Sequence, residues 1–232
     1  MIQRYYFAEI PVDAGPRREI RETVVNWMTE GEKPRQVITL NATMLITALK
    51  NARLKQIIRN ADLVTADGYS IMLALKKRGF WTERFPGVEL ADQLLKFCIE
   101  ERLRVYCYGG SKETVFWLRR KFASNGLMII REGFDQNEDL IREEIVKVKP
   151  ILLLTGLGSP RQEIFLDETL PYLTATVGMG IGGAFEVISG QKSRPPAILR
   201  DNGWEWCCRM VRDPKKLKHL PELAKFWYLF LK

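Results

Sequence analysis

The sequence predicts an α/β fold built on a Rossmann-like, mostly parallel sheet that is flanked by helices. Short apolar runs alternate with segments of helical periodicity from one end of the chain to the other. The clearest run, I-L-L-L-T at 151–155, is apolar up to its final threonine, which is typical of a strand buried on both faces. With 232 residues, of which 46% are hydrophobic, the chain can bury one large core.

The first half of the chain supplies three of the expected strands. An opening strand is expected at 5–12, and two short apolar runs at 36–40 and 63–66 are expected to be buried parallel strands. Helical spacing predicts helices at 16–30, 42–50, 53–60 and 69–77. The segments 42–50 and 53–60 are either separate helices or the two arms of one bent helix. Residues 78–87 form a loop, which is either a lid over a cleft or a surface segment with packed aromatic side chains.

The second half continues the alternation. Strands are expected at 104–108, 127–130, 151–155 and 175–178. Helices are expected at 88–101, 112–124 and 137–147, with another opening at Pro160 and a short one at 222–231. We see no internal repeat. We expect two parts: an α/β domain at 1–190 and a basic, aromatic, helical C-terminal appendage at 191–232.

Polar residues end two of the strands in the first half. Thr39 and Asn41 follow the first apolar run, and Asp67 follows the second, immediately before a glycine. Ligands of open α/β sheets bind beyond the carboxyl ends of the strands, so these side chains are expected at one edge of a cleft. A carboxylate placed there can serve as a general base. The alternative is ordinary turn chemistry, with Asn41 capping the next helix.

Glycine-rich turns mark further candidate binding positions. The pair at 109–110 lies between a strand and a helix N-terminus, an arrangement that suits a phosphate but also suits a close-packed turn. The segment G-L-G-S-P-R-Q-E at 156–163 opens a helix, and M-G-I-G-G-A-F-E at 179–186 implies unusual backbone angles or a close ligand. The candidate binding residues from these turns and the 78–87 loop are Arg84, Gly109, Gly110, Arg161, Gln162, Gly182 and Gly183.

Charge and composition point to an anionic partner. The formal net charge is +8, which favours a phosphorylated substrate, an acidic membrane surface or nucleic acid. The four cysteines show no metal-ligand spacing and are expected to be reduced, so we expect neither a metal site nor a cofactor. The N-terminus is too polar for a secretory signal, and no run of 18 apolar residues exists, which favours a cytoplasmic location.

The C-terminal tail, residues 191–232, combines cations with aromatic side chains. This mixture is typical of segments that lie at a membrane surface, and we favour membrane association through this tail. The alternative is an appendage packed on the sheet with a solvated basic face. An apolar face on the tail is also compatible with a homo-oligomer. Because the cations gather in the tail and not along a groove-reading helix, we expect no nucleic-acid partner.

Taken together, the motifs resemble those of the WecG/TagA/CpsF family, glycosyltransferases of family 26. The resemblance runs from about Tyr5 to Lys216. It rests on the order and spacing of seven motifs: V-I-T-L-N, A-D-G, E-R-F-P-G, G-L-G-S-P-R-Q-E, G-x-G-G-A-F-E, R-P-P and G-W-E-W.

The resemblance implies an inverting, UDP-sugar-dependent hexosyltransferase. Residues 1–190 would then form its nucleotide-sugar-binding catalytic domain, and residues 191–232 its membrane-associating appendage. Its donor would be a UDP-sugar, such as one carrying N-acetylmannosamine or a related hexose or uronate. Its acceptor would be an undecaprenyl-diphosphate-linked sugar, in cell-surface polysaccharide or teichoic acid synthesis. The protein would then sit peripherally at the inner face of the cell membrane. A positively charged protein suits a donor and an acceptor that both carry diphosphates.

The resemblance also implies roles for particular residues. Asp67 corresponds to the proposed base, while Thr39, Asn41 and Gln162 correspond to residues of the sugar-nucleotide pocket. Arg209 and Lys216 correspond to basic positions of the appendage, which is proposed to close over the site and hold phosphate. The candidate catalytic residues are therefore Asp67 and Arg209. The chain departs from the usual family residues at a few positions, so the resemblance leaves the donor sugar open. These positions are Leu40, Glu89, Arg161, Glu186, Lys216 and His219.

Two other function classes compete with this reading. A dinucleotide-dependent Rossmann enzyme would need a G-x-G-x-x-G motif after an early strand, and the sequence has none. A non-catalytic module that binds a membrane surface or a nucleotide would use the positive charge of the chain. Its function would not depend on Asp67 as a base.

Overall fold

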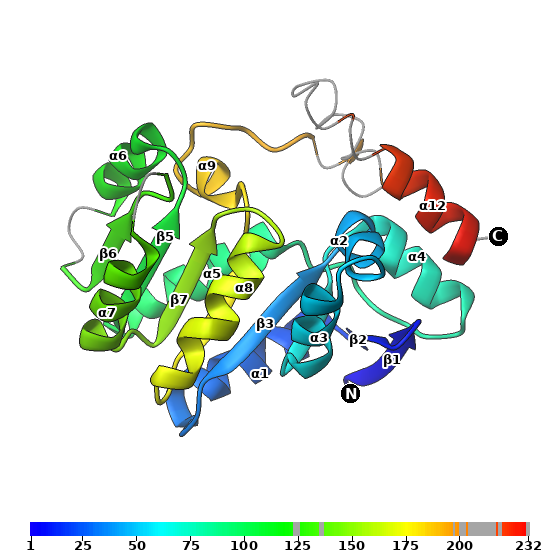
Figure 1. The fold of residues 1–232 in the computed structure, drawn as a ribbon, viewed down its shortest axis with the longest axis horizontal. Coiled ribbons are helices and arrows are strands. Elements are labelled where there is room, and N and C mark those ends of the chain that lie inside the picture. Colours follow the sequence, from blue (N-terminus) through cyan, green and yellow to red (C-terminus); the bar gives the residue numbers. More distant parts are fainter. Residues whose placement is uncertain are drawn as a thin grey trace.

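The computed structural model places eight strands in one sheet, in the order β1-β2-β4-β3-β8-β7-β5-β6 (Figure 1). It describes residues 1–122, 126–134, 137–196, 198–199, 203, 217 and 220–230. The strands are β1 (Gln3–Phe7), β2 (Ile10–Ala14), β3 (Arg35–Leu40), β4 (Leu63–Ala66), β5 (Val105–Gly109), β6 (Met128–Arg131), β7 (Leu152–Gly156) and β8 (Val177–Gly180).

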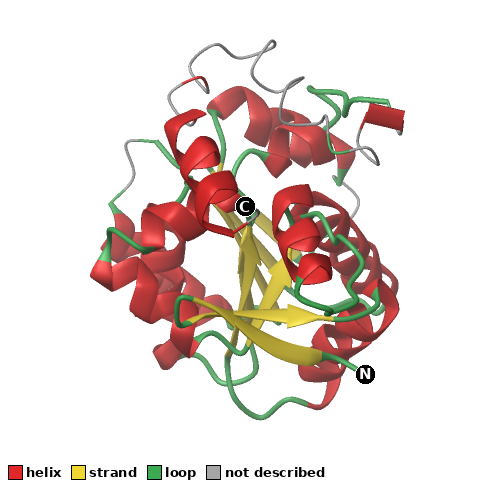
Figure 2. Ribbon diagram, turned by 90° about the vertical axis from the view of Figure 1, so that its right-hand side faces the viewer, coloured by secondary structure: helices red, strands yellow, loops and turns green. Residues whose placement is uncertain are grey.

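Every strand pair except β1 with β2 is parallel, which confirms the predicted fold class. Helices cover both faces of the sheet, as the view turned by 90° shows (Figure 2). They are α1 (Arg17–Glu30), α2 (Ala42–Ala48), α3 (Ala52–Asn60), α4 (Tyr69–Lys77), α5 (Gly87–Glu100), α6 (Lys112–Lys121), α7 (Glu138–Val148), α8 (Arg161–Thr169), α9 (Ala184–Ile188) and α12 (Leu220–Phe230).

The alternation of strand side chains explains why both faces are apolar. On β7, Leu152 and Leu154 pack into the cluster formed with α1, α5 and α6, whereas Leu153 packs into the cluster formed with α7 and α8. Successive strand residues point to opposite faces, so a strand buried on both sides must be apolar at every position. The continuous I-L-L-L sequence therefore specifies a central strand between two helical layers.

The expectation of a single opening strand at 5–12 is wrong. The chain instead forms the β1–β2 hairpin, whose two turn residues, Ala8 and Glu9, both have positive φ angles of 47° and 69°. Two-residue hairpin turns with positive φ at both positions usually carry Asn-Gly or Asp-Gly, so this turn lacks the usual sequence signal. The prediction for β8 was also displaced, because the strand begins at Val177 and ends at Gly180.

Local contacts decide between the alternatives left open by the sequence: two helices or one bent helix at 42–60, and a lid or a packed surface segment at 78–87. Residues 42–60 form two helices, because Asn51 caps a separate α3 by accepting a hydrogen bond from the Leu54 N–H. In the 78–87 loop, Phe85 is fully buried in the core and its N–H bonds to the Ala66 carbonyl at 3.0 Å. The loop is therefore packed onto the sheet, which favours the packed surface segment over the lid.

Helix α12 lies against the first part of the chain and not against the second. Its Phe226 is fully buried in the cluster that includes Phe7 and α2, and Arg78 donates a hydrogen bond to the Phe230 carbonyl at 2.9 Å. Its other side exposes Trp227 and Tyr228. One face of this helix is thus an element of the core, while the opposite face is aromatic and open to solvent.

Candidate active site

A cavity of about 530 Å³ opens where β3, β4 and β8 end, at the carboxyl edge of the sheet. We call it the cleft. Side chains from both halves of the sheet line it, together with the start of α5, the start of α8 and the segment that follows α9. The candidate residues that line it are Thr39, Asn41, Asp67, Gln162, Gly182 and Gly183. The structure therefore brings together six of the side chains and turns that the sequence placed at a ligand site.

Asp67 is held at the cleft by its neighbours on both sides. Its N–H bonds to the Leu40 carbonyl at 3.0 Å, which ties the turn after β4 to the end of β3. One carboxylate oxygen, Oδ1, accepts the Gly87 N–H at 2.7 Å, at the first residue of α5. Arg84 donates from Nε to the Asp67 carbonyl at 2.7 Å. The carboxylate thus has a fixed direction while it lines the cleft.

Thr39 and Asn41 have structural roles as well as cleft positions. Thr39 donates a long hydrogen bond of 3.4 Å from Oγ1 to the Gly180 carbonyl, across the β3–β8 pair. Asn41 caps α2, since its Oδ1 accepts the Met44 N–H at 3.0 Å. The capping alternative for Asn41 is thereby confirmed. Its side-chain nitrogen is a donor that the cap does not use.

Gln162 links α8 to the glycine turn after β8. Its Oε1 accepts the Gly182 N–H at 2.9 Å, and its Nε2 donates to Glu163 Oε1 at 2.7 Å. A Cβ atom at Gly180 would lie 2.6 Å from the Gln162 nitrogen, so only glycine lets the amide approach the strand this closely. Gln162 is 4% exposed and Glu163 is 1% exposed, so these contacts are shielded from water.

The Glu163 carboxyl is a buried acid directly behind the cleft wall. Burial raises its pKa above the ordinary value, and the hydrogen bond from Gln162 opposes that rise. Gln36 on β3 donates to the Glu163 backbone carbonyl at 3.3 Å. Glu163 therefore orients the Gln162 amide from one side while Gly182 holds it from the other. Nothing in the sequence singled out Glu163, although it follows Gln162 in the G-L-G-S-P-R-Q-E segment.

Four other candidates in the described residues lie outside the cleft lining: Arg84, Arg161, Gly109 and Gly110. Arg84 reaches the site through its hydrogen bond to the Asp67 carbonyl. Arg161 turns toward α7, with Nε 2.7 Å from Glu138 Oε1. At Gly109, an added Cβ would lie 2.6 Å from the Gly156 backbone, and at Gly110 it would lie 3.0 Å from Thr114. These contacts show close packing between β5, β7 and α6. A phosphate role for these positions stays a prediction.

The candidates Arg209 and Lys216 fall outside the described residues. The described part of the tail nevertheless contributes to the cleft, because residues 191–195 line it. Arg194 donates to Glu89 Oε1 at 2.6 Å, and Arg17 donates to the other Glu89 oxygen at 2.9 Å. Lys192 pairs with Glu186 at 2.6 Å. From the sequence, Arg194 and Lys192 were identified only as cations of the tail. The signal for Arg194 was its place in the R-P-P motif.

The described residues hold no group of three or more His, Cys, Asp or Glu side chains that could bind a metal ion. Among the helices that the structure describes, none has the length and apolar character needed to cross a bilayer.

The fold and the cleft together define a doubly wound α/β protein with a cleft beyond the carboxyl ends of its strands, which is where proteins of this architecture bind their ligands. Comparison with protein families assigns the class further. The chain belongs to the Glycosyl transferase WecG/TagA/CpsF family, whose model matches residues 5–232. This confirms the resemblance drawn from the seven motifs.

Two relatives of the chain are both named N-acetylglucosaminyldiphosphoundecaprenol N-acetyl-beta-D-mannosaminyltransferase. A relative from Bacillus spizizenii is 25% identical over 201 residues, which cover 84% of this chain and 78% of that protein. A relative from Staphylococcus aureus is 27% identical over 201 residues, which cover 84% of this chain and 79% of that protein.

Proposed function

We propose that this protein is an inverting hexosyltransferase that moves a sugar from a UDP-sugar to a polyprenyl-diphosphate-linked sugar. The observation that carries the proposal is the placement of Asp67, whose carboxylate lines the cleft and is oriented by the Gly87 N–H. The names of the relatives support the acceptor class, and they favour N-acetylmannosamine as the transferred sugar. Synthesis of teichoic acid or another cell-surface polysaccharide would consume the product.

The proposed reaction is a single displacement at the anomeric carbon of the donor. Asp67 accepts the proton of the acceptor hydroxyl while that oxygen forms a bond to the anomeric carbon. The bond between the anomeric carbon and the UDP oxygen breaks on the opposite face, so the configuration inverts. The bonding electron pair leaves with UDP, and the proton stays on the Asp67 carboxyl until it exchanges with water.

Groups around the cleft provide the electrostatic part of this mechanism. Negative charge develops on the departing diphosphate, and cations or backbone N–H groups directed at it lower the barrier. Arg194 and Lys192 are the described cations in the cleft lining, and the glycine turn at 182–183 presents backbone there. We propose that Arg209 and Lys216 of the tail add further cations. Thr39, Asn41 and Gln162 would bind the donor through neutral hydrogen bonds.

We also propose that the tail docks at the inner face of the cell membrane. The exposed side of α12 supports this, because Trp227 is 46% exposed and Tyr228 is 66% exposed. Aromatic side chains of this kind favour the boundary between headgroups and acyl chains. A lipid-linked acceptor would then meet the cleft from the bilayer surface, without leaving the membrane.

The test is acceptor-dependent release of UDP. Purified protein is incubated with a panel of UDP-hexoses and a short-chain lipid-diphosphate-N-acetylglucosamine, and UDP release is followed with time. The proposal expects release with one donor, strictly dependent on acceptor. Release of UDP at the same rate without acceptor, or no binding of UDP by titration calorimetry, would contradict it.

A further inference from the structure

Helix α6 carries an outward face that the cleft does not use. Phe116 is 57% exposed and Trp117 is 38% exposed, and their rings pack edge to face with centroids 5.4 Å apart. The Arg120 guanidinium lies 5.5 Å from the Trp117 ring centroid. The inward side of the helix is buried, through Val115 and Leu118. Two large aromatic side chains therefore pack against each other at the surface, outside the hydrophobic core clusters.

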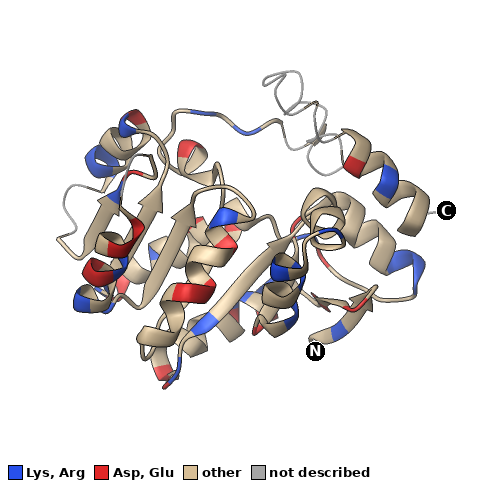
Figure 3. Cartoon of the chain, in the orientation of Figure 1, with Lys and Arg blue, Asp and Glu red and all other residues tan. Residues whose placement is uncertain are grey.

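The same helix is rich in cations. Four cations and one carboxylate lie along it: Lys112, Arg119, Arg120, Lys121 and Glu113. Within the described part of the chain, none of these four cations takes part in an ion pair, although other exposed helices pair theirs internally. On α7, for example, Arg142 lies 2.6 Å from Asp139, and on α5 Lys96 lies 2.7 Å from Asp92. The positive charge of α6 is thus left for an outside partner; Figure 3 shows its cations in blue.

A groove beside the aromatic pair concentrates this charge. The groove has a volume of about 770 Å³ and runs between α6 and the end of β6. Arg131 in its wall is neutralised by Glu144 at 2.6 Å. Arg119 donates to the Ile130 carbonyl at 2.8 Å and forms an ion pair with none of the described carboxylates. The groove lining is Lys112, Val115, Phe116, Arg119, Arg120, Arg131 and Glu132.

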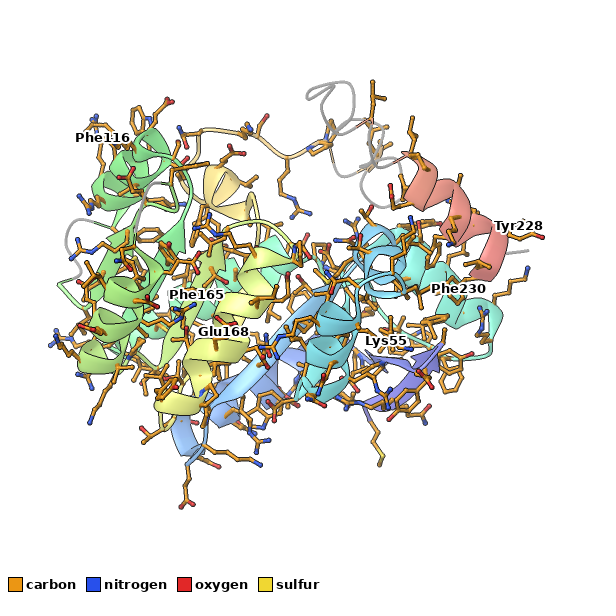
Figure 4. The ribbon with its side chains drawn as sticks, in the orientation of Figure 1. Lys55, Phe116, Phe165, Glu168, Tyr228 and Phe230 are labelled. Atoms are coloured by element: carbon orange, nitrogen blue, oxygen red, sulfur yellow. The ribbon has the colours of Figure 1, made fainter. Side chains whose placement is uncertain are left out.

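The position of α6 places this face beside the mouth of the cleft. The helix follows β5, so it begins at the carboxyl edge of the sheet, where the cleft opens (Figure 1). It packs against α9, whose residues Ala184 and Glu186 line the cleft, and Lys121 donates to the α9 residue Ile188. In Figure 4, Phe116 lies at the outer surface on the left of the molecule, and Tyr228 of α12 lies at the surface on the right.

We propose that this α6 face, formed by Lys112, Phe116, Trp117, Arg119 and Arg120, docks on an anionic lipid bilayer. It forms a second membrane contact on the other side of the cleft from α12. Aromatic rings settle at the headgroup boundary, and cations are attracted to anionic headgroups, so a bilayer satisfies both kinds of side chain at once. The inference rests on the proposed function in one respect: a lipid-linked acceptor gives the cleft a reason to face a membrane.

Charge complementarity favours a bilayer over a second copy of the chain. In a two-fold symmetric dimer the same patch meets itself. The cations of one α6 face would then approach those of the other, with one carboxylate in each helix to offset them. An anionic bilayer presents the opposite charge over the whole face. A second contact also fixes the tilt of the cleft relative to the bilayer, which a single helix at the tail would leave free.

The test is vesicle flotation of the full chain on two lipid compositions. Vesicles contain either phosphatidylcholine alone or a mixture of phosphatidylcholine with about one third phosphatidylglycerol. The variants are Arg120→Glu, which reverses one exposed charge, and Phe116→Ser, which removes one exposed ring. Matched controls are Lys147→Glu at the end of α7 and Tyr172→Ser after α8. Both positions are also exposed, but they lie near the amino ends of the strands, away from the carboxyl edge where the cleft opens. Thermal unfolding confirms that each variant folds.

Arg120→Glu is expected to weaken binding to the anionic vesicles by about 10- to 30-fold, since each basic residue near such a surface contributes roughly fivefold in affinity and the reversal changes two units of charge. Phe116→Ser is expected to weaken it by about fivefold or more. Both controls should bind like the wild type. Binding of both α6 variants at wild-type affinity would overturn the proposal. So would a change from dimer to monomer by light scattering with vesicle binding unaltered, which would make the face a subunit contact.

A parallel activity measurement separates this inference from the proposed function. The α6 variants should lose turnover of an acceptor embedded in vesicles and keep turnover of a short-chain, water-soluble acceptor. Equal loss on both acceptors would contradict a docking role. If wild-type protein turns over neither acceptor but the vesicle affinities still differ as expected, the proposed function fails and the membrane contact stands.

Discussion

The hydrogen-bonded chain from Glu163 through Gln162 to Gly182 predicts a large effect of Gln162→Leu. Leucine has nearly the same volume but neither polar atom. The change leaves the Gly182 N–H without its acceptor at 2.9 Å and the Glu163 carboxyl without its donor at 2.7 Å. A buried polar group left unpaired costs about 1–3 kcal/mol. Gly182 borders the cleft and can bond to water there, so we expect a total loss of about 2–4 kcal/mol.

This loss converts to a shift in melting temperature. For a chain of this length, about 1 kcal/mol corresponds to roughly 2 °C, so Gln162→Leu is expected to melt about 4–8 °C below the wild type. The assay is thermal unfolding followed by circular dichroism, with urea unfolding as a second measure of the free energy. UDP affinity, measured by titration calorimetry, should also fall, because the glycine turn that borders the cleft loses its anchor.

Gln36→Leu is the matched control. Gln36 is also a buried glutamine, at 7% exposed, but its side chain makes one long hydrogen bond of 3.3 Å and lies outside the cleft lining. It should lose about 1 kcal/mol or less and keep the wild-type affinity for UDP. If Gln162→Leu melted within 1 °C of the wild type, or if both variants behaved alike, the argument that this amide holds the glycine turn would be refuted.

Three further changes test other parts of the structure. Because burial holds the folded-state pKa of Glu163 above 4.5, the folded state keeps the proton where the unfolded chain has lost it. The free energy of unfolding therefore falls as the pH rises from the pKa of Glu163 in the unfolded chain to its higher pKa in the folded protein. Glu163→Gln should remove this part of the pH dependence in urea unfolding. Gly109→Ala should cost about 3 kcal/mol or more in the same assay, since φ is 140° and the new Cβ would lie 2.6 Å from the Gly156 backbone. Arg194→Ala should weaken UDP binding about tenfold and flatten its salt dependence, because Arg194 is a cation of the cleft lining; unchanged affinity and salt slope by calorimetry would remove it from the site.

The sequence was informative where periodicity and burial determine the structure. Helix α4 and strand β4 occur as expected, because an apolar run bounded by turn residues leaves little choice of element. The β1–β2 hairpin was missed because Ala8 and Glu9 adopt positive φ without glycine or asparagine. Such a turn is imposed by the pairing of its strands, and local propensity does not reveal it.

Some residues of the candidate site could be predicted from the sequence and others could not. Residues at strand ends, such as Asp67 and Thr39, could be placed from the sequence, since the carboxyl edge of a parallel sheet gathers them. Arg161 could not, because a position at a helix start does not say which way a long side chain turns, and here it meets Glu138. The Arg194–Glu89 contact joins positions 105 residues apart in sequence, and no local pattern encodes such a pairing.

The most direct test of the central claim is the rate of sugar transfer by Asp67→Asn. Asparagine keeps an oxygen that can accept the Gly87 N–H at 2.7 Å but cannot take a proton from the acceptor. The control is Asp62→Asn, a carboxylate that pairs with Arg35 and lies outside the cleft lining. The account predicts a fall in kcat of about 10²–10⁴ for Asp67→Asn, with UDP affinity preserved and Asp62→Asn near wild type. Transfer by Asp67→Asn at the wild-type rate, in a protein that still binds UDP, would contradict it.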